Sequence, residues 1–204
     1  MFANAGKYEA CGIFTRDHFI LLVITIIGII VALKYTVNKD KNTIYKIIKY
    51  TTIVAWILEV IKIYFNIKQN SIKAVNTYAP LYYCSILLYA GLLSSFGKGV
   101  LKRIGDVSLA TGAIVGGIVF IIYPSTSLPF YPAFHFLSIH SFLFHGAMIY
   151  LGILINKTRY IDLELKDAKY FAILIGCMSI LALIVNMLLK VFYYVIRNIK
   201  WQCH

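Results

Sequence analysis

Long apolar runs separated by short links are the feature that most limits how this chain can fold. The run from Phe19 to Leu33 contains no charged residue, and further apolar stretches follow along the chain. A helix of about 20 apolar residues crosses the roughly 30 Å hydrocarbon core of a bilayer. The chain is 60% hydrophobic, with a mean hydropathy of +0.78, whereas soluble domains are about 45–50% apolar. These patterns predict an all-α, polytopic membrane helix bundle.

The hydropathy pattern predicts six transmembrane helices in one membrane domain covering residues 1–204. The first apolar run follows mixed charges and has no A-x-A site after it, so it is interpreted as a helix rather than a cleaved signal. The short connections make neighbouring helices antiparallel. The link from Pro124 to Pro132 has three prolines and no charge, which indicates a rigid turn or a segment in the membrane interface. The predicted helices cover residues 18–35, 45–67, 77–96, 105–123, 133–155 and 170–193.

The net charge of +12 does not indicate a nucleic-acid partner. Most basic residues lie between the apolar runs, and no soluble domain is left to carry a nucleic-acid surface. Twelve of the 20 Lys and Arg residues follow the first, third and fifth predicted helices. The positive-inside rule therefore places those links in the cytoplasm and both termini outside, which predicts a multi-pass protein of the cell membrane. The twelve are Lys34, Lys39, Lys41, Lys46, Lys49, Lys98, Lys102, Arg103, Lys157, Arg159, Lys166 and Lys169.

Polar side chains of the second and third predicted helices lie in the outer half of the bundle. The helical rise places Cys84 and Glu59 roughly 10 Å below the outer surface, with Lys62 one turn shallower. An ionisable residue at this depth normally faces the bundle interior and has a partner. Glu59 and Lys62 are three residues apart and can neutralise each other. Two interpretations stay open: a structural ion pair, or a carboxylate that orients or charges a histidine.

The fifth predicted helix carries three histidines in its outer part. His135, His140 and His145 lie at depths of roughly 3, 10 and 18 Å. Successive spacings of five rotate each ring by about 140°, so one helix face cannot present all three to a metal. The usual role of a membrane histidine is a hydrogen bond across helices, but the shared depth predicts that at least one belongs to a site. His18, which opens the first helix, and Asn186, in the last helix, also lie toward the outer side.

The cysteines predict no disulfide framework and no zinc site, since none has C-x-x-C spacing. We also predict no metal and no cofactor. A buried cysteine is usually a small apolar side chain. With a histidine within reach, Cys84 becomes a candidate nucleophile, because the imidazole can take the thiol proton. The four cysteines are Cys11, Cys84, Cys177 and Cys203.

Several short motifs, in order along nearly the whole chain, resemble one family. The segment Ala79-Pro-Leu-Tyr-Tyr-Cys84 is similar to the L-P-L-H-L-C segment of YwaF-like integral membrane proteins, which are related to the transmembrane protein 164 family. Trp56-x-x-Glu59-x-x-Lys62 resembles that family's W-x-x-E-x-x-K motif. Tyr123-Pro124, His135-Phe136 and Phe144-His145-Gly146 resemble the family's Y-P, H-F and S-H-G motifs, in that order. Asp17-His18 resembles a histidine that opens the family's first helix, and Asn186 resembles an asparagine in its last helix.

The resemblance implies acyl transfer between membrane lipids through a cysteine. Cys84 would accept the acyl group, His145 or His135 would act as base, and Glu59 or Asn186 would orient the base. The histidine two residues before the family's cysteine is Tyr82 in this chain, which removes one candidate base. We place Cys84, His145, His135 and Glu59 as catalytic candidates. The binding candidates are His18, Lys62, Tyr82, His140 and Asn186.

Two other classes of function also fit the sequence. A small-solute or ion transporter would use Glu59, Lys62 and the histidines as a relay. No inverted repeat is visible, and the polar residues gather on one side of the membrane. Both observations favour a transporter less than an acyl-transferring enzyme. A non-enzymatic lipid-binding protein would use its polar residues only to join helices. Membrane lipids are the partners expected for the enzyme and for the lipid-binding protein.

Overall fold

Helices make up all the regular structure in the described part of the chain. The computed structural model describes residues 6–69 and 79–202. The helices are α1 (Arg16–Thr36), α2 (Lys41–Gln69), η2 (Tyr83–Ser85), α3 (Ile86–Phe96), α4 (Gly99–Ala110), α5 (Gly112–Ile122), α6 (Phe136–Lys157), η3 (Leu165–Asp167) and α7 (Ala168–Gln202). This all-helical architecture confirms the predicted fold class.

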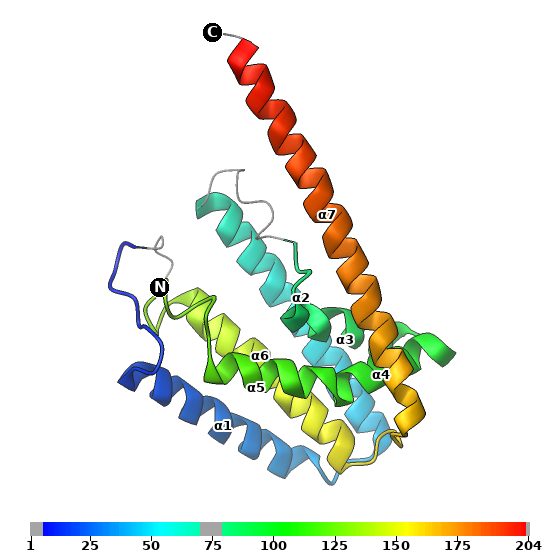
Figure 1. The fold of residues 1–204 in the computed structure, drawn as a ribbon. Helices are drawn as coiled ribbons and strands as arrows, with labels where there is room; N and C mark the ends of the chain where they lie inside the picture. Colours follow the sequence, from blue (N-terminus) through cyan, green and yellow to red (C-terminus); the bar gives the residue numbers. More distant parts are fainter. Residues whose placement is uncertain (1–5, 70–78, 203–204) are drawn as a thin grey trace.

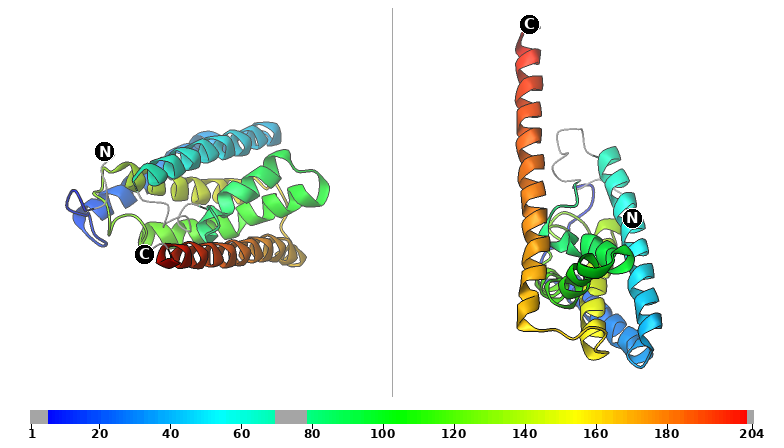
Figure 2. Two further views of the ribbon diagram at one scale, coloured as in Figure 1. Left: turned by 90° about the horizontal axis from the view of Figure 1, so that it is seen from above. Right: turned by 90° about the vertical axis from the view of Figure 1, so that its right-hand side faces the viewer.

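The helices form a bundle around α6, which contacts α1, α2, α4 and α5. In Figure 1, α1 and α5 run alongside α6, and α7 extends well beyond the other helices. Figure 2 shows α2 and α7 on opposite sides, with α3, α4 and α5 between them. The central position of α6 means that its polar side chains face other helices.

Within residues 6–69 and 79–202, four segments are long and apolar enough to cross a membrane: Arg16–Thr36, Gly99–Ile122, Phe136–Lys157 and Leu165–Leu188. The second helix, α2, is not among them, and it carries Glu59 and Lys62 in its second half. The apolar segment Tyr83–Phe96 is shorter than a full span. The number of six transmembrane helices therefore stays a prediction.

Among the helix starts, two differ most from those predicted, each for a local reason, and α7 ends at Gln202, beyond the predicted residue 193. Part of the range predicted as residues 77–96 lies outside the described residues, and its helical part begins only at Tyr83. Pro80 precedes this start, and proline disfavours helical backbone in the residue before it. The range predicted as 105–123 begins earlier, at Gly99, and includes Lys102 and Arg103. These two charges can lie inside the helix because Asp106 (2.9 Å from Lys102) and Asp167 neutralise them.

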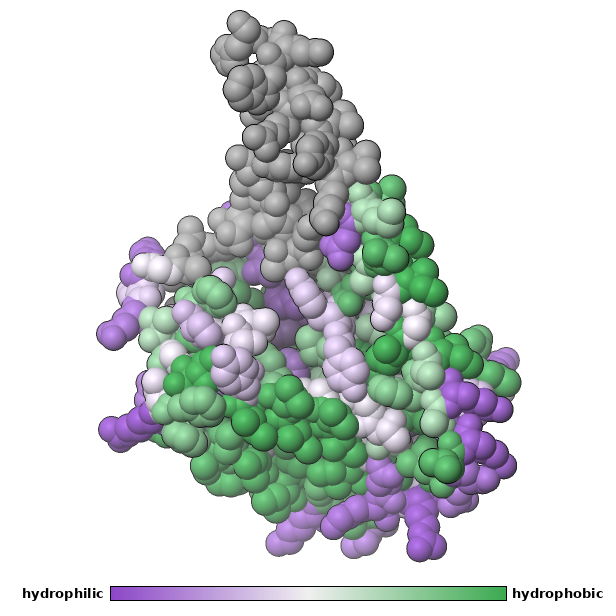
Figure 3. Space-filling model, viewed as in Figure 1, coloured by the Kyte–Doolittle hydropathy of each residue, from purple (hydrophilic) through white to green (hydrophobic). Residues whose placement is uncertain are grey.

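Apolar side chains cover much of the molecular surface, as expected for a chain that faces lipid. In Figure 3 they form a broad apolar area, and hydrophilic side chains lie along the lower and right-hand edges of this view. The fully buried core lies where α2, α3 and α6 meet, and includes Ile48, Leu87, Leu88, Met148 and Leu151. Lipid-facing helices with a separate packed core are the arrangement that a bilayer favours.

Glycines let the helices near the cavity approach closely. A Cβ atom at Gly117 of α5 would lie 2.8 Å from the carbonyl oxygen of His145 on α6. Such a contact is too short, so only glycine allows α5 to pack this closely against α6. This approach places α5 directly beside the histidine-bearing face of α6.

Candidate active site

A cavity of about 530 Å³ lies between α2, η2, α5 and α6. Polar side chains from several elements line it, together with apolar side chains of α5 and α6. The lining residues are Glu59, Lys62, Asn66, Tyr82, Tyr83, Cys84, Ser85, Val115, Gly116, Val119, Phe120, Tyr123, Ser125, Thr126, Tyr131, Leu137, His140, Ser141, Phe144 and His145. We call this space the polar cavity.

Glu59 and Lys62 form an ion pair on one wall of the polar cavity. Lys62 Nζ lies 2.6 Å from Glu59 Oε1, and the two side chains are 28% and 3% exposed, respectively. The spacing of three residues puts both on one face of α2. The second carboxylate oxygen of Glu59, Oε2, lies 3.9 Å from His140 Nε2. Glu59 is therefore held by Lys62 on one side and faces a histidine on the other.

His140 is buried, and neither of its ring nitrogens has a hydrogen-bond partner among the described residues. Its ring lies between Phe136 and Phe144, with a centroid distance of 5.8 Å to each. A buried polar group without a partner carries a free-energy cost. Because His140 lines the polar cavity, a hydrogen-bonding group of a bound molecule could reach its ring nitrogens from the cavity.

His145 is held in one orientation. Its Nδ1 lies 2.7 Å from the Ser141 carbonyl oxygen, one turn back in α6. Its ring stacks on Phe120, with centroids 3.6 Å apart and planes 7° from parallel. Because a carbonyl oxygen only accepts, Nδ1 carries the proton, and Nε2 of the neutral ring keeps its lone pair. This buried Nε2 has no hydrogen-bond partner among the described residues.

Cys84 lies in the short helix η2 and lines the polar cavity together with His140 and His145. Its thiol is free. The neighbouring Tyr83 hydroxyl donates to the Gly112 carbonyl oxygen (3.1 Å), which fixes η2 against α5. The structure thus brings a thiol and two histidines, far apart in sequence, to one cavity.

Three of the predicted site residues lie elsewhere. His135 caps α6, where its Nδ1 accepts from the Leu137 backbone N–H at 3.2 Å, and it does not line the polar cavity. His18 Nε2 donates to the Ile121 carbonyl oxygen at 3.0 Å, and its Nδ1 accepts from the Phe14 N–H at 3.0 Å. Asn186 is exposed on α7. The observed contacts of His135 and His18 position helices.

Other cavity residues were not predicted from the sequence. Phe120, which supports the His145 ring, lies in an apolar helix and had no distinguishing signal. Ser125, Thr126 and Tyr131 come from the proline-rich link, which supplies part of the wall. Uncharged polar residues between the prolines were the available signal for this role. Among the described residues, no group of three or more His, Cys, Asp or Glu residues could hold a metal ion.

We expect Glu59 and Lys62 to act as a pair in stability. Lys62→Met leaves the buried Glu59 carboxylate without its partner, and Glu59→Gln leaves a more exposed ammonium. Lys62→Met should therefore be the more destabilising, although by less than the roughly 3–5 kcal/mol of a fully buried pair. The double variant should lose less stability than the two single losses added together. Unfolding of the detergent-solubilised variants measures this, and strictly additive losses would show that the pair does not interact.

These observations define the chain as a membrane protein of several apolar helices with a polar cavity between them. The model of the TMEM164 family matches residues 13–200. The chain therefore belongs to the TMEM164 family, which confirms the relationship that the motifs predicted. No curated protein matches the chain, and no solved structure matches it.

Proposed function

We propose that this protein transfers acyl groups between membrane lipids through a thioester on Cys84. One observation carries the proposal. Cys84 shares the polar cavity with His145, whose Nδ1–H is held by Ser141 while its Nε2 is unpaired among the described residues. An imidazole held in this tautomer can take a proton from a thiol, and the thiolate is the nucleophilic form of cysteine.

The first half of the reaction forms the thioester. His145 Nε2 takes the Cys84 proton, and the sulfur attacks the carbonyl carbon of a lipid ester. The tetrahedral intermediate collapses by breaking the bond between that carbon and the ester oxygen. The departing alkoxide takes the proton back from His145 and leaves as a lipid with a free hydroxyl. The acyl group stays on Cys84.

The second half returns the enzyme to its starting state. The hydroxyl of an acceptor lipid attacks the thioester carbonyl and gives its proton to His145 Nε2. The bond from carbon to sulfur breaks, and the proton passes to the Cys84 thiolate. One ester is broken and one is formed, so no oxidant, reductant or metal is required.

Glu59 has a separate place in this scheme. It faces His140, at 3.9 Å, whereas the Ser141 carbonyl oxygen orients His145. His140 is therefore a second imidazole on the wall of the polar cavity, between Glu59 and the space that the substrate would occupy.

The surroundings of the polar cavity suit an amphipathic substrate. Exposed polar side chains, Ser125 and Thr126, border one part of it, and exposed apolar side chains, Val115 and Val119, border another. A lipid with a polar head group and apolar chains matches both borders. The ion pair of Glu59 and Lys62 adds no net charge to the site.

The direct test uses the purified protein in vesicles. A phospholipid with one deuterated acyl chain serves as donor, and a lysophospholipid serves as acceptor. Mass spectrometry should find the labelled chain on the acceptor in proportion to the amount of protein. If the label stays on the donor while the protein remains folded, this function is wrong.

A further inference from the structure

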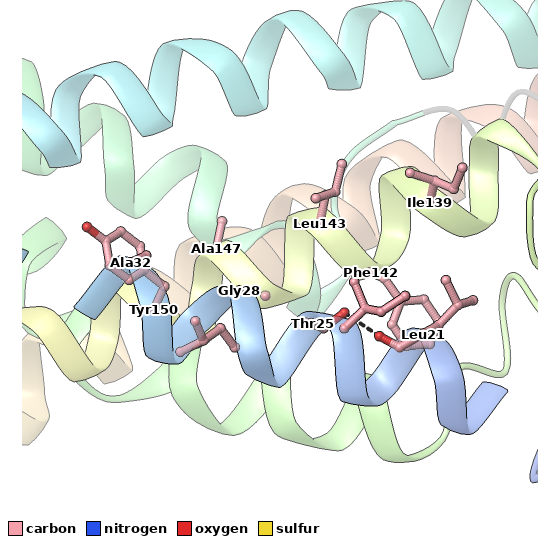
Figure 4. A pocket seen from close by; sticks show the side chains of 12 residues that line it. Leu21, Thr25, Gly28, Ala32, Ile139, Phe142, Leu143, Ala147 and Tyr150 are labelled. Carbon is pink, nitrogen blue, oxygen red and sulfur yellow. Dashed lines mark hydrogen bonds between the residues drawn. The ribbon is translucent and has the colours of Figure 1, made fainter. Parts of the chain in front are cut away.

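A second cavity, separate from the polar cavity, lies between α1 and α6 (Figure 4). Its volume is about 400 Å³, and it shares no lining residue with the polar cavity. We call it the apolar groove. Its lining is apolar or small along both helices and includes Leu21, Gly28 and Ala32 of α1 and Leu143, Gly146 and Ala147 of α6.

The apolar groove presents no free polar group to an occupant. The Thr25 hydroxyl donates to the Leu21 carbonyl oxygen at 2.8 Å within α1, as Figure 4 shows. The Tyr150 hydroxyl donates to Thr36 Oγ1 at 3.1 Å. No lining residue is charged. An occupant with hydrogen-bonding groups would lose its own partners here, so the groove favours hydrocarbon.

The dimensions of the groove distinguish a hydrocarbon chain from a helix. The lining of α1 runs from Leu21 to Ala32, which corresponds to roughly 16 Å of helical rise. Dividing the volume of about 400 Å³ by this length gives a cross-section of roughly 25 Å², whereas a helix about 10 Å across needs roughly 80 Å². A single file of methylene groups fits this width, because carbon atoms in contact are about 3.5–4.0 Å apart.

The position of the groove places it within reach of lipid chains. Both of its walls, α1 and α6, are apolar and long enough to cross a membrane. Ile24 and Leu143 at its edge are 60% and 61% exposed. Hydrocarbon is thus both the neighbouring material and the material that fits.

Polar contacts near both ends of α1 hold it against its neighbours. Near its start, His18 is bonded to the Ile121 carbonyl oxygen of α5, and near its end Thr36 is bonded to Tyr150 of α6. Between them, a Cβ atom at Gly146 would lie 2.9 Å from Thr25 Cγ2, so the helices already touch there. A Cβ atom at Gly28 would meet nothing within 4 Å. The helices therefore cannot close the space by moving together.

We propose that the apolar groove is a binding site for one acyl chain of a membrane lipid. The site does not depend on acyl transfer in the polar cavity. It assigns a function to the small residues Gly28 and Ala147, which keep the groove open. Its ligand class is a lipid with at least one saturated or flexible hydrocarbon chain.

The test uses the full-length protein in vesicles of phosphatidylcholine that carries a photoreactive diazirine in one acyl chain. After irradiation, peptide mapping should find crosslinks on groove residues from both α1 and α6. Native mass spectrometry should find one lipid retained per chain. Gly28→Leu fills open space and should lower this retention by roughly tenfold or more, because a bulky side chain displaces the acyl chain from the groove.

The matched control is Gly176→Leu on α7, where a Cβ atom also meets nothing within 4 Å. It should retain lipid as the wild type does. Crosslinking of the unmodified chain keeps the test decisive if Gly28→Leu does not fold. Full retention by a folded Gly28→Leu variant, or crosslinks that avoid the groove, would overturn the proposal. A groove occupied by a second copy of the chain, shown by loss of a dimer in Gly28→Leu, would overturn it as well.

Discussion

Cys84→Ala should reduce acyl transfer to the rate of the reaction without protein. The substitution removes the only atom that carries the acyl group in the proposed reaction. Loss of a covalent nucleophile typically costs on the order of 10⁴-fold or more in rate. Because the side chain is small and lies at a cavity wall, the fold should tolerate the change. The measurement is the initial rate of labelled-chain transfer in vesicles, compared at equal amounts of folded protein.

The control for Cys84→Ala is Cys177→Ala, which removes an exposed free thiol on α7. This variant should transfer acyl chains at the wild-type rate. Transfer by Cys84→Ala within about tenfold of the wild-type rate, a gap of only about 1.4 kcal/mol in barrier height, would mean that Cys84 is not the nucleophile. The cysteine would then be a packed small side chain.

His145→Phe should slow formation of the thioester by roughly 10²–10⁴-fold, the range typical of a lost general base. Phenylalanine keeps a ring that can stack on Phe120, but it has no nitrogen to take the thiol proton. The readout is the rate at which a single turnover acylates Cys84, together with the unfolding temperature. A purely structural role would change the second quantity and leave the first unchanged per folded molecule.

His135→Ala is the comparison for this variant. It removes the side chain that caps α6, so it should cost about 1 kcal/mol of stability. Its acylation rate per folded molecule should stay close to that of the wild type, since His135 does not line the polar cavity. If His135→Ala lost the activity and His145→Phe kept it, the assignment of the base would be reversed.

Part of the site could be predicted from the sequence. Helical rise assigned Glu59, Cys84 and His140 to one level, and all three line the polar cavity. The depth of Cys84 stays a prediction, because its helix begins at Tyr83 and not at residue 77. His18 and Asn186 were also predicted toward the outer side, yet neither lines the polar cavity. Hydropathy and rise give a position along a helix axis, but they do not give the direction in which a side chain points or which helix stands beside it.

The helix boundaries show the same limit of sequence reasoning. The backbone at Thr111 leaves helical geometry, with φ −122° and ψ −76°, and separates α4 from α5 within one apolar segment. Hydropathy does not detect such a break, because apolar residues continue on both sides of it, from Leu109 and Ala110 into Ala113 and Ile114. The early start of α4 was missed for the opposite reason. Lys102 and Arg103 have the composition of a link, but their ion pairs with Asp106 and Asp167 let them lie within the helix.

His145 and His135 have different contacts because different elements pack beside them. Both occupy family motif positions, and the sequence alone left both open as the base. The stacking of His145 on Phe120 and its bond to Ser141 depend on the packing of α5 against α6. The cap formed by His135 depends only on its place before the first turn of α6. Local sequence could indicate the second contact more readily than the first.

The most direct measurement is the mass of the protein after brief exposure to donor lipid without acceptor. We predict an increase equal to one acyl chain, located on the peptide that contains Cys84 and removed by neutral hydroxylamine, which cleaves thioesters. His145→Phe should accumulate this adduct slowly, and Cys84→Ala should not form it. Acyl transfer that proceeds with no adduct on Cys84 would contradict the thioester mechanism.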